Sequence, residues 1–191
     1  MSSKTTNFPI AQRFTVANDK KRFSTYVYSC EKSSRMTFHL AQLNIARMLA
    51  PIDSPVMADF VANLDRINAI AENSKGFVWR LKDDSNNATS IRIFDDDFLI
   101  VNMSVWQNVD ALFRFAYQSD HLEIFKRRTE WFEKMPEMHM VLWYVPEGSM
   151  PSVADAVERL THLRQRGETP YAFSFKKRFT PEEAVAASNE Q

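Results

Sequence analysis

Polar and aromatic side chains alternate along the most strand-like segment of the chain. Residues Phe98–Trp106 read FLIVNMSVW and are rich in residues that favour strands. Side chains two positions apart share one face of a strand, so we expect Asn102, Ser104 and Trp106 on the same face. An amide, a hydroxyl and an indole in a row can stabilise a negative charge that develops on a bound molecule. The alternative is that Asn102 and Trp106 are satisfied groups of the core.

His121 is the second candidate for chemistry. We expect a helix to start at Asp120, with Glu123 completing a capping box, which places His121 in the first turn. The positive end of the helix dipole disfavours the imidazolium, and a neutral imidazole can act as a general base or bind a metal. The alternative is that His121 only packs at the helix start. The histidines show no H-x-H or H-E-x-x-H spacing, so we predict no dedicated metal site.

Trp79 and Arg80 are adjacent in a short predicted strand, so their side chains are expected on opposite faces. An arginine on a half-buried strand requires an acidic partner or an anionic ligand. An ion pair is the commoner explanation of the two.

Helices and strands that could position these residues alternate along the chain. The first helix has Ser54 as its cap, Pro55 at the first helical position and Gly76 just past its end. The apolar residues expected on the helix faces are Val56, Phe60, Leu64, Ile67 and Ala71 in the first helix, Val109, Leu112, Phe113 and Ala116 in the second, and Leu122, Phe125 and Phe132 in the helix from Asp120. A further helix runs from the cap Ser152 to Gly167. Strands are expected at 37–45, 77–81, 91–94, 98–106, 138–145 and 171–175.

The order β-α-β-β-α-β, with a helix and a strand appended, predicts an α+β ferredoxin-like fold, in which helices cover one face of an antiparallel sheet. The strands are apolar on both sides, so the other face cannot remain in water. We therefore expect a homodimer that closes one sheet on another. A charged substitution at Val101 or Met103 should then give monomers or insoluble protein.

Composition excludes several classes of function. The chain has 191 residues and zero formal net charge, which argues against a general nucleic-acid or membrane-surface binder. Three glycines and no G-x-G-x-x-G or P-loop argue against a nucleotide site. The single Cys30 excludes a disulfide framework, and no apolar run is long enough for a transmembrane helix. We expect a cytoplasmic protein.

Several motifs together resemble the dimeric α/β-barrel superfamily, and within it an uncharacterised single-domain family. They are HLAQLN (39–44), GFVWRL (76–81), VNMSVW (101–106), the His121 and Trp131-Phe132 spacing, and VLWYVPEG (141–148). The resemblance implies a dimeric barrel domain over residues 36–179. Residues 1–35 precede it as an extension with seven Lys/Arg against two acidic residues, either partly disordered, a docking arm or a targeting segment. Residues 180–191 are expected to be a loose polar tail.

The nearest branch with known chemistry is the antibiotic-biosynthesis monooxygenases, which oxidise phenols or anthrones with O2 and without a cofactor. They place an Asn and a Trp four residues apart on one strand, as Asn102 and Trp106 are here, and Asn44 lies where they often have another Asn. Other branches bind haem, cyclise polyketides or isomerise lactones, and fold alone does not choose among them.

The sequence therefore predicts a pocket between sheet and helices that takes an aromatic or polyketide-like molecule of secondary metabolism. The expected catalytic residues are Asn102, Trp106, His121 and Asn44. The expected substrate-binding residues are Phe60, Leu64, Trp79, Arg80, Ser104, Phe113, Phe125 and Trp143. The expected activity is a cofactor-independent monooxygenation or a cyclisation, with no cofactor. A non-catalytic or stress-associated binding dimer and a haem protein are the alternatives.

Overall fold

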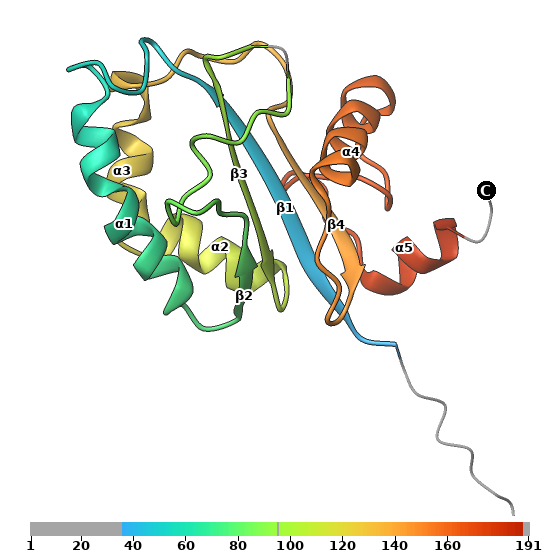
Figure 1. Ribbon diagram of the computed structural model, residues 1–191. Coiled ribbons are helices and arrows are strands. Elements are labelled where there is room, and N and C mark those ends of the chain that lie inside the picture. Colours follow the sequence, from blue (N-terminus) through green and yellow to red (C-terminus); the bar gives the residue numbers. More distant parts are fainter. Residues whose placement is uncertain (1–35, 95, 189–191) are drawn as a thin grey trace, which may run out of the picture. The chain divides into compact units, whose positions relative to one another are not determined.

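The computed structural model describes residues 36–94 and 96–188 (Figure 1). The predicted extension, residues 1–35, lies outside the described residues. No helix in the described part of the chain is long and apolar enough to cross a bilayer.

A sheet of antiparallel strands forms the centre of the domain. The strands are β1 (Phe38–Arg47), β2 (Phe77–Arg80), β3 (Leu99–Trp106) and β4 (Met140–Pro146), in the order β2-β3-β1-β4. This order, with β1 and β3 in the middle, is that of a ferredoxin-like split βαβ fold and confirms the predicted class. The register places Asn44 of β1 directly opposite Asn102 of β3.

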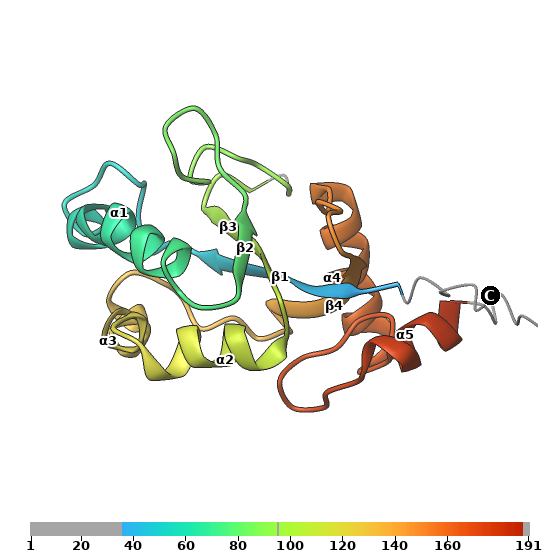
Figure 2. The same ribbon diagram turned by 90° about the horizontal axis from the view of Figure 1, so that it is seen from below.

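Helices lie over both faces of this sheet (Figures 1 and 2). On one side are α1 (Ala58–Glu72), α2 (Val109–Gln118) and α3 (His121–Lys126), followed by a 3₁₀ turn at Arg128–Glu130. On the other side is α4 (Val153–Arg166). The last element is α5 (Pro181–Ser188).

The sheet face that we expected to be bare is covered within the chain. Val101, Met103 and Val105 are buried there in one cluster with Leu160 and Leu163 of α4. Apolar residues of the β2–β3 connection pack against the same cluster: Leu81, Ala88, Ile91, Ile93 and Phe94. The expectation was wrong because helix periodicity does not reveal which face of a sheet a helix will cover. A homodimer stays a prediction, but it no longer follows from an uncovered apolar face.

Two of the predicted helix starts differ from the structure. Helix α1 begins after Met57 without a side-chain cap, and the hydroxyl of Ser54 is buried with no hydrogen-bond partner among the described residues. Asp120 has helical backbone angles, whereas a capping residue needs extended ones, so its predicted capping box with Glu123 does not form. The cap at Ser152 is confirmed, and it forms a full capping box with Asp155.

The predicted strands at 91–94 and 171–175 do not form. Ile91–Phe94 lies within the connection that covers the α4-side core. Phe173 makes a single bridge to Leu142, in which each backbone N–H donates to the other residue's carbonyl at 2.7 and 2.9 Å. Part of the tail expected to be loose is helix α5, and the Tyr144 hydroxyl holds the preceding segment by donating to the carbonyl of Phe179 at 2.8 Å.

Replacing Tyr144 with Phe is expected to lower the free energy of unfolding by about 1 kcal/mol, the net value of one hydrogen bond. Burial, with the charges of Glu182 and Glu183 adding to it, raises the pKa of Tyr144 to about 12, so the hydroxyl remains a neutral donor. Urea denaturation measures the change. Tyr171→Phe is the matched control, because it removes only an exposed contact to Glu158 and should change stability by less than about 0.5 kcal/mol. Equal effects of the two variants would contradict the role of the Phe179 contact.

Candidate functional site

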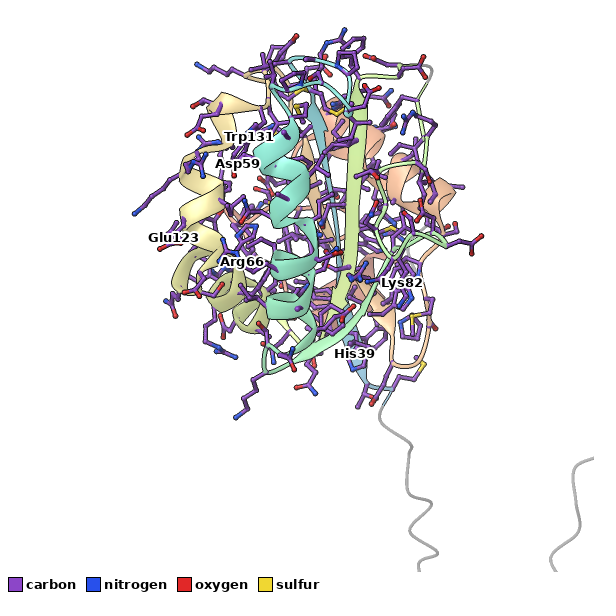
Figure 3. All side chains as sticks on the ribbon, turned by 60° about the vertical axis from the view of Figure 1, so that its left-hand side comes forward. His39, Asp59, Arg66, Lys82, Glu123 and Trp131 are labelled. Carbon is purple, nitrogen blue, oxygen red and sulfur yellow. The ribbon has the colours of Figure 1, made fainter. Side chains whose placement is uncertain are left out.

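A cavity of about 600 Å³ lies between the sheet and the helices α1, α2 and α3. Its floor is the sheet face that carries Gln42, Asn44, Asn102, Ser104 and Trp106. Both α1 and α3 lie in front of this face in Figure 3. The predicted pocket between sheet and helices is therefore present.

The helices leave a hollow because they do not pack tightly onto the sheet. Phe60, Leu64 and Ile67 form the apolar face of α1, yet they are only half-buried and line the cavity. Ala71 is the one buried residue within α1, and α3 contributes none. An apolar helix face that is half-covered in this way is typical of a binding pocket, since a core helix would bury it.

Hydrogen bonds fix the polar groups of the floor. The Gln42 amide nitrogen donates to Oδ1 of Asn102 at 2.7 Å and to Oγ of Ser104 at 3.0 Å. Because Oδ1 of Asn102 is used in this way, the two N–H groups of its amide remain for a ligand. Asn44 also lines the cavity, directly opposite Asn102, and its side chain makes no hydrogen bond among the described residues. The floor thus presents two neighbouring neutral amides.

Trp106 does not serve as the donor that the sequence suggested. Its Nε1–H donates to Ser104 Oγ at 2.8 Å, and the residue is 0% exposed. The indole packs edge-on against Phe77 at 5.3 Å and stacks on Phe115 at 5.1 Å between ring centroids. Trp106 therefore forms part of an aromatic wall, and Asn102 is the available donor.

His121 extends that wall, and one of its ring nitrogens faces no partner among the described residues. Its ring lies 4.7 Å from Phe115 and 6.2 Å from Phe125 between centroids. Nδ1 is 3.1 Å from the carbonyl oxygen of Ala116, which can only accept, so Nδ1 carries the proton of the neutral ring. Burial lowers the pKa of His121, and the bond to Ala116 opposes that effect in part. Nε2 makes no hydrogen bond to any described residue. The lowered pKa favours the neutral ring that was expected, but its main cause is burial.

Arg80 lies at the cavity, 8% exposed, and is paired. Its Nε donates to Glu72 Oε1 at 2.8 Å, and Nη2 donates to Asn86 Oδ1 at 3.0 Å. The ion-pair interpretation of this arginine is confirmed, and it ties the end of α1 to β2.

The aromatic residues chosen from the sequence divide between the cavity and other places. Phe60, Leu64, Ser104 and Phe125 line the cavity as predicted. Trp79 and Trp143 pack in the α4-side core, on the opposite face of the sheet. Phe113 contacts Tyr117 and Phe175 at 4.8 and 5.6 Å and does not line the cavity. Their selection was wrong because residue type was weighed without the strand or helix position that sets direction.

Possible metal ligands lie apart in the described part of the chain, which contains no group of three or more His, Cys, Asp or Glu side chains suited to a metal ion. Of the other histidines, His139 also lines the cavity, whereas His39 and His162 do not. Haem binding, the other alternative from the sequence, stays a prediction.

A family model described as a domain of unknown function, DUF3291, matches residues 39–189. The chain belongs to the DUF3291 family. The match agrees with the resemblance to an uncharacterised single-domain family. No curated protein matches the DUF3291 chain.

Solved structures similar to this DUF3291 chain are distant from it. SnoaB, a cofactor-independent oxygenase from Streptomyces nogalater, is 21% identical, with 60% of this chain and 98% of that one covered and a TM-score of 0.41. A protein from Pseudomonas aeruginosa is 14% identical, with the same shares covered and a TM-score of 0.39. A protein of unknown function from Nitrosomonas europaea is 10% identical, with 61% and 96% covered and a TM-score of 0.38.

Sequence reasoning missed two residues of the candidate site in this DUF3291 chain, Gln42 and Phe115. Gln42 lies two residues before Asn44, so the alternation of side chains along a strand places both on one face. This spacing could have identified Gln42 as a residue of the site. Phe115 lies three residues after Leu112 on the same helix face. The hydrogen bond from Trp106 to Ser104 could not be predicted from the sequence, because a contact between side chains at positions i and i+2 depends on their rotamers.

Gln42→Leu is expected to destabilise the DUF3291 domain by about 1–3 kcal/mol, because it leaves Oδ1 of Asn102 without its donor and removes one of the two donors to Oγ of Ser104. Gln42 is 6% exposed, so water does not readily replace it. Guanidinium denaturation checks the change. Gln118→Leu, on the exposed end of α2, should stay within about 0.5 kcal/mol of the unmodified chain. Unchanged stability of Gln42→Leu would show that the polar floor is not held by this residue.

Proposed function

We propose that the protein is an enzyme that binds a flat aromatic molecule in the cavity, removes a proton from it and lets O2 oxidise the resulting anion without a cofactor. The observation that carries the proposal is the neutral His121, with Nε2 unprotonated, in the same cavity as the amides of Asn44 and Asn102. The resemblance to the antibiotic-biosynthesis monooxygenases supplies the oxygenation step.

The proposed first step is a proton transfer. Nε2 of His121 accepts a proton from an acidic C–H or O–H of the substrate. The charge then spreads onto a substrate oxygen, which the Asn102 N–H groups stabilise as neutral donors, with Asn44 beside them. Gln42 holds the Asn102 amide in place beforehand. The apolar wall excludes water that would otherwise quench the anion.

The proposed oxidation needs no redox group from the protein. The carbanion gives one electron to O2, and the resulting carbon radical and superoxide combine into a peroxide that takes up a proton. Loss of water from the peroxide leaves a carbonyl. A methylene group and one O2 thus yield a ketone and one H2O, as in the conversion of an anthrone to a quinone.

Oxygen uptake with an anthrone tests the proposal. Asn102→Ala is expected to lower the rate by about 100-fold, the usual effect of removing one donor to an oxyanion. Gln165→Ala, an exposed change on α4, serves as the matched control and should leave the rate unchanged. No uptake above background with any anthrone or hydroquinone in a panel, or an undiminished rate in Asn102→Ala, would contradict the proposal.

Binding without catalysis is the second candidate. It is favoured by the internal use of the Trp106 N–H, which leaves the floor with few donors for a transition state. Saturable ligand binding with no oxygen uptake and no proton exchange would support it. A haem protein would instead show a strong absorption band in the haem region after reconstitution.

A further inference from the structure

Charged groups around the cavity are unevenly balanced. Glu133 is the one acidic residue among the described residues that line it, and its carboxylate is paired with Arg47 at 3.4 Å. Arg80 is likewise paired, with Glu72. Arg128 and Lys134 also line the cavity, are exposed, and have no ion-pair partner among the described residues. Two exposed cations without an ion-pair partner therefore line a cavity whose other charged side chains, Arg80 and Glu133, are paired.

Arg128 is held in this position by its surroundings. Its guanidinium carbon lies 4.6 Å from the centre of the Phe125 ring, and Nη1 donates to the Phe125 carbonyl at 3.1 Å. Phe125 itself lines the cavity and is partly exposed. An aromatic contact and one backbone bond leave the other donors of Arg128 for an anion, for which a guanidinium is well suited.

Arg127, the residue before Arg128, is by contrast fully engaged in ion pairs that link two helices. Arg127 donates to Asp59 of α1 at 2.5 Å and to Glu130 at 2.7 Å, and lies 4.8 Å from the Trp131 ring. Figure 3 shows Asp59 and Trp131 at the same end of the α1–α3 pair. Arg127 thus occupies both nearby carboxylates and links the helices, which leaves Arg128 unpaired.

We propose that the ligand of this cavity is an aromatic molecule with one acidic group, whose rings enter the cavity while Arg128 and Lys134 bind the acid at its mouth. This inference rests on the proposed function, since it names the substrate class of the same site. The described residues place no unpaired cation inside the cavity, so the acid is bound at the mouth and the reacting part of the molecule reaches the amide floor.

A pair of fluorescent dyes with nearly the same aromatic body tests the inference. Anilinonaphthalene sulfonate carries one negative charge, and phenylnaphthylamine is neutral. We expect the sulfonate to bind about tenfold more tightly, as one charge-assisted contact provides, and the difference to shrink in high salt. Arg128→Gln with Lys134→Gln should remove the preference without weakening the neutral dye. Arg114→Gln, an exposed cation of α2 outside the cavity, is the matched control and should keep the preference.

A cavity-filling variant and circular dichroism locate the binding. Leu64→Trp should displace both dyes while the far-ultraviolet spectrum stays unchanged. Equal affinity for the two dyes, or a preference that survives the double variant, would overturn the acidic-ligand inference and leave the aromatic-binding proposal standing. Failure of both dyes to bind, or binding that Leu64→Trp does not affect, would overturn both.

Discussion

Gly76→Ala is expected to lower the free energy of unfolding by about 2–4 kcal/mol, through backbone strain and a steric clash together. Gly76 joins α1 to β2 with φ of +89°, where residues with a side chain are strained. A Cβ there would lie 2.6 Å from the Cβ of Ala111, which is buried at the start of α2. The carbonyl of Gly76 also accepts from the N–H of Gln107 at 2.7 Å, so the turn cannot move freely.

Gly148→Ala separates the two causes. Gly148 has φ of +81°, and a Cβ there would meet no atom within 4 Å, so only the backbone cost of about 1–2 kcal/mol should appear. Urea denaturation of both variants gives the difference that belongs to the Ala111 contact. If Gly76→Ala costs no more than Gly148→Ala, then α2 does not press on the turn as closely as described.

His121→Phe is expected to reduce kcat by about 10²–10⁴-fold, the usual contribution of a general base. Phenylalanine keeps the stacking on Phe115 and Phe125 and removes the free Nε2, so aromatic ligands should still bind. In the unmodified protein, the kcat/KM of the proposed reaction should rise with pH through the pKa of His121, which burial holds below its ordinary value of 6.5. Activity should therefore persist at pH values where an exposed histidine is already charged.

His162→Gln is the matched control for that experiment. Burial also lowers the pKa of His162, with nearby Arg166 and Arg159 adding to the effect, but the residue lies on α4 outside the cavity. Its replacement should leave kcat and the acid limb of the pH profile unchanged. Retention of full kcat by His121→Phe would exclude the imidazole as the base and leave the binding alternative.

Stability should also depend on pH through His121. Between its lowered pKa in the folded chain and about 6.5, the unfolded chain binds a proton that the native chain does not. The free energy of unfolding is therefore constant above this window and falls as the pH drops through it. His121→Phe should reduce that slope, which urea titrations at several pH values measure; an unchanged slope would place the proton uptake elsewhere.

Much of the fold could be predicted from the runs of strand-forming residues and from the residue types at the turns between them. The segments that form β1, β2, β3 and β4 are rich in strand-forming apolar residues and end at a change of pattern, so their existence and order followed from the sequence. Which face of the sheet α4 covers could not be predicted, because the spacing of Leu160 and Leu163 shows only that the helix has a buried face. Asp120 failed as a cap for a similar reason, since its backbone angles depend on the packing of α2 against α3.

The candidate site could be predicted where strand alternation shows which face of the sheet a side chain points to. Asn102, Ser104 and Trp106 share a face by their spacing, and the structure places all three at the cavity. The same reasoning excludes Trp79, since Arg80 takes the cavity side, and Trp143, since Leu142 is on the α2 side. Hydrogen bonds between side chains, such as that from Gln42 to Asn102, required the structure because they depend on which strands become neighbours.

Because α4 and the β2–β3 connection cover the sheet within one chain, we expect the proposed ligand binding to need no second subunit. Where two subunits must pair their sheets to keep them from water, dilution separates the subunits and weakens ligand binding. Here each chain shields its own sheet, so dissociation constants measured by titration should be independent of protein concentration across the range in which any self-association occurs.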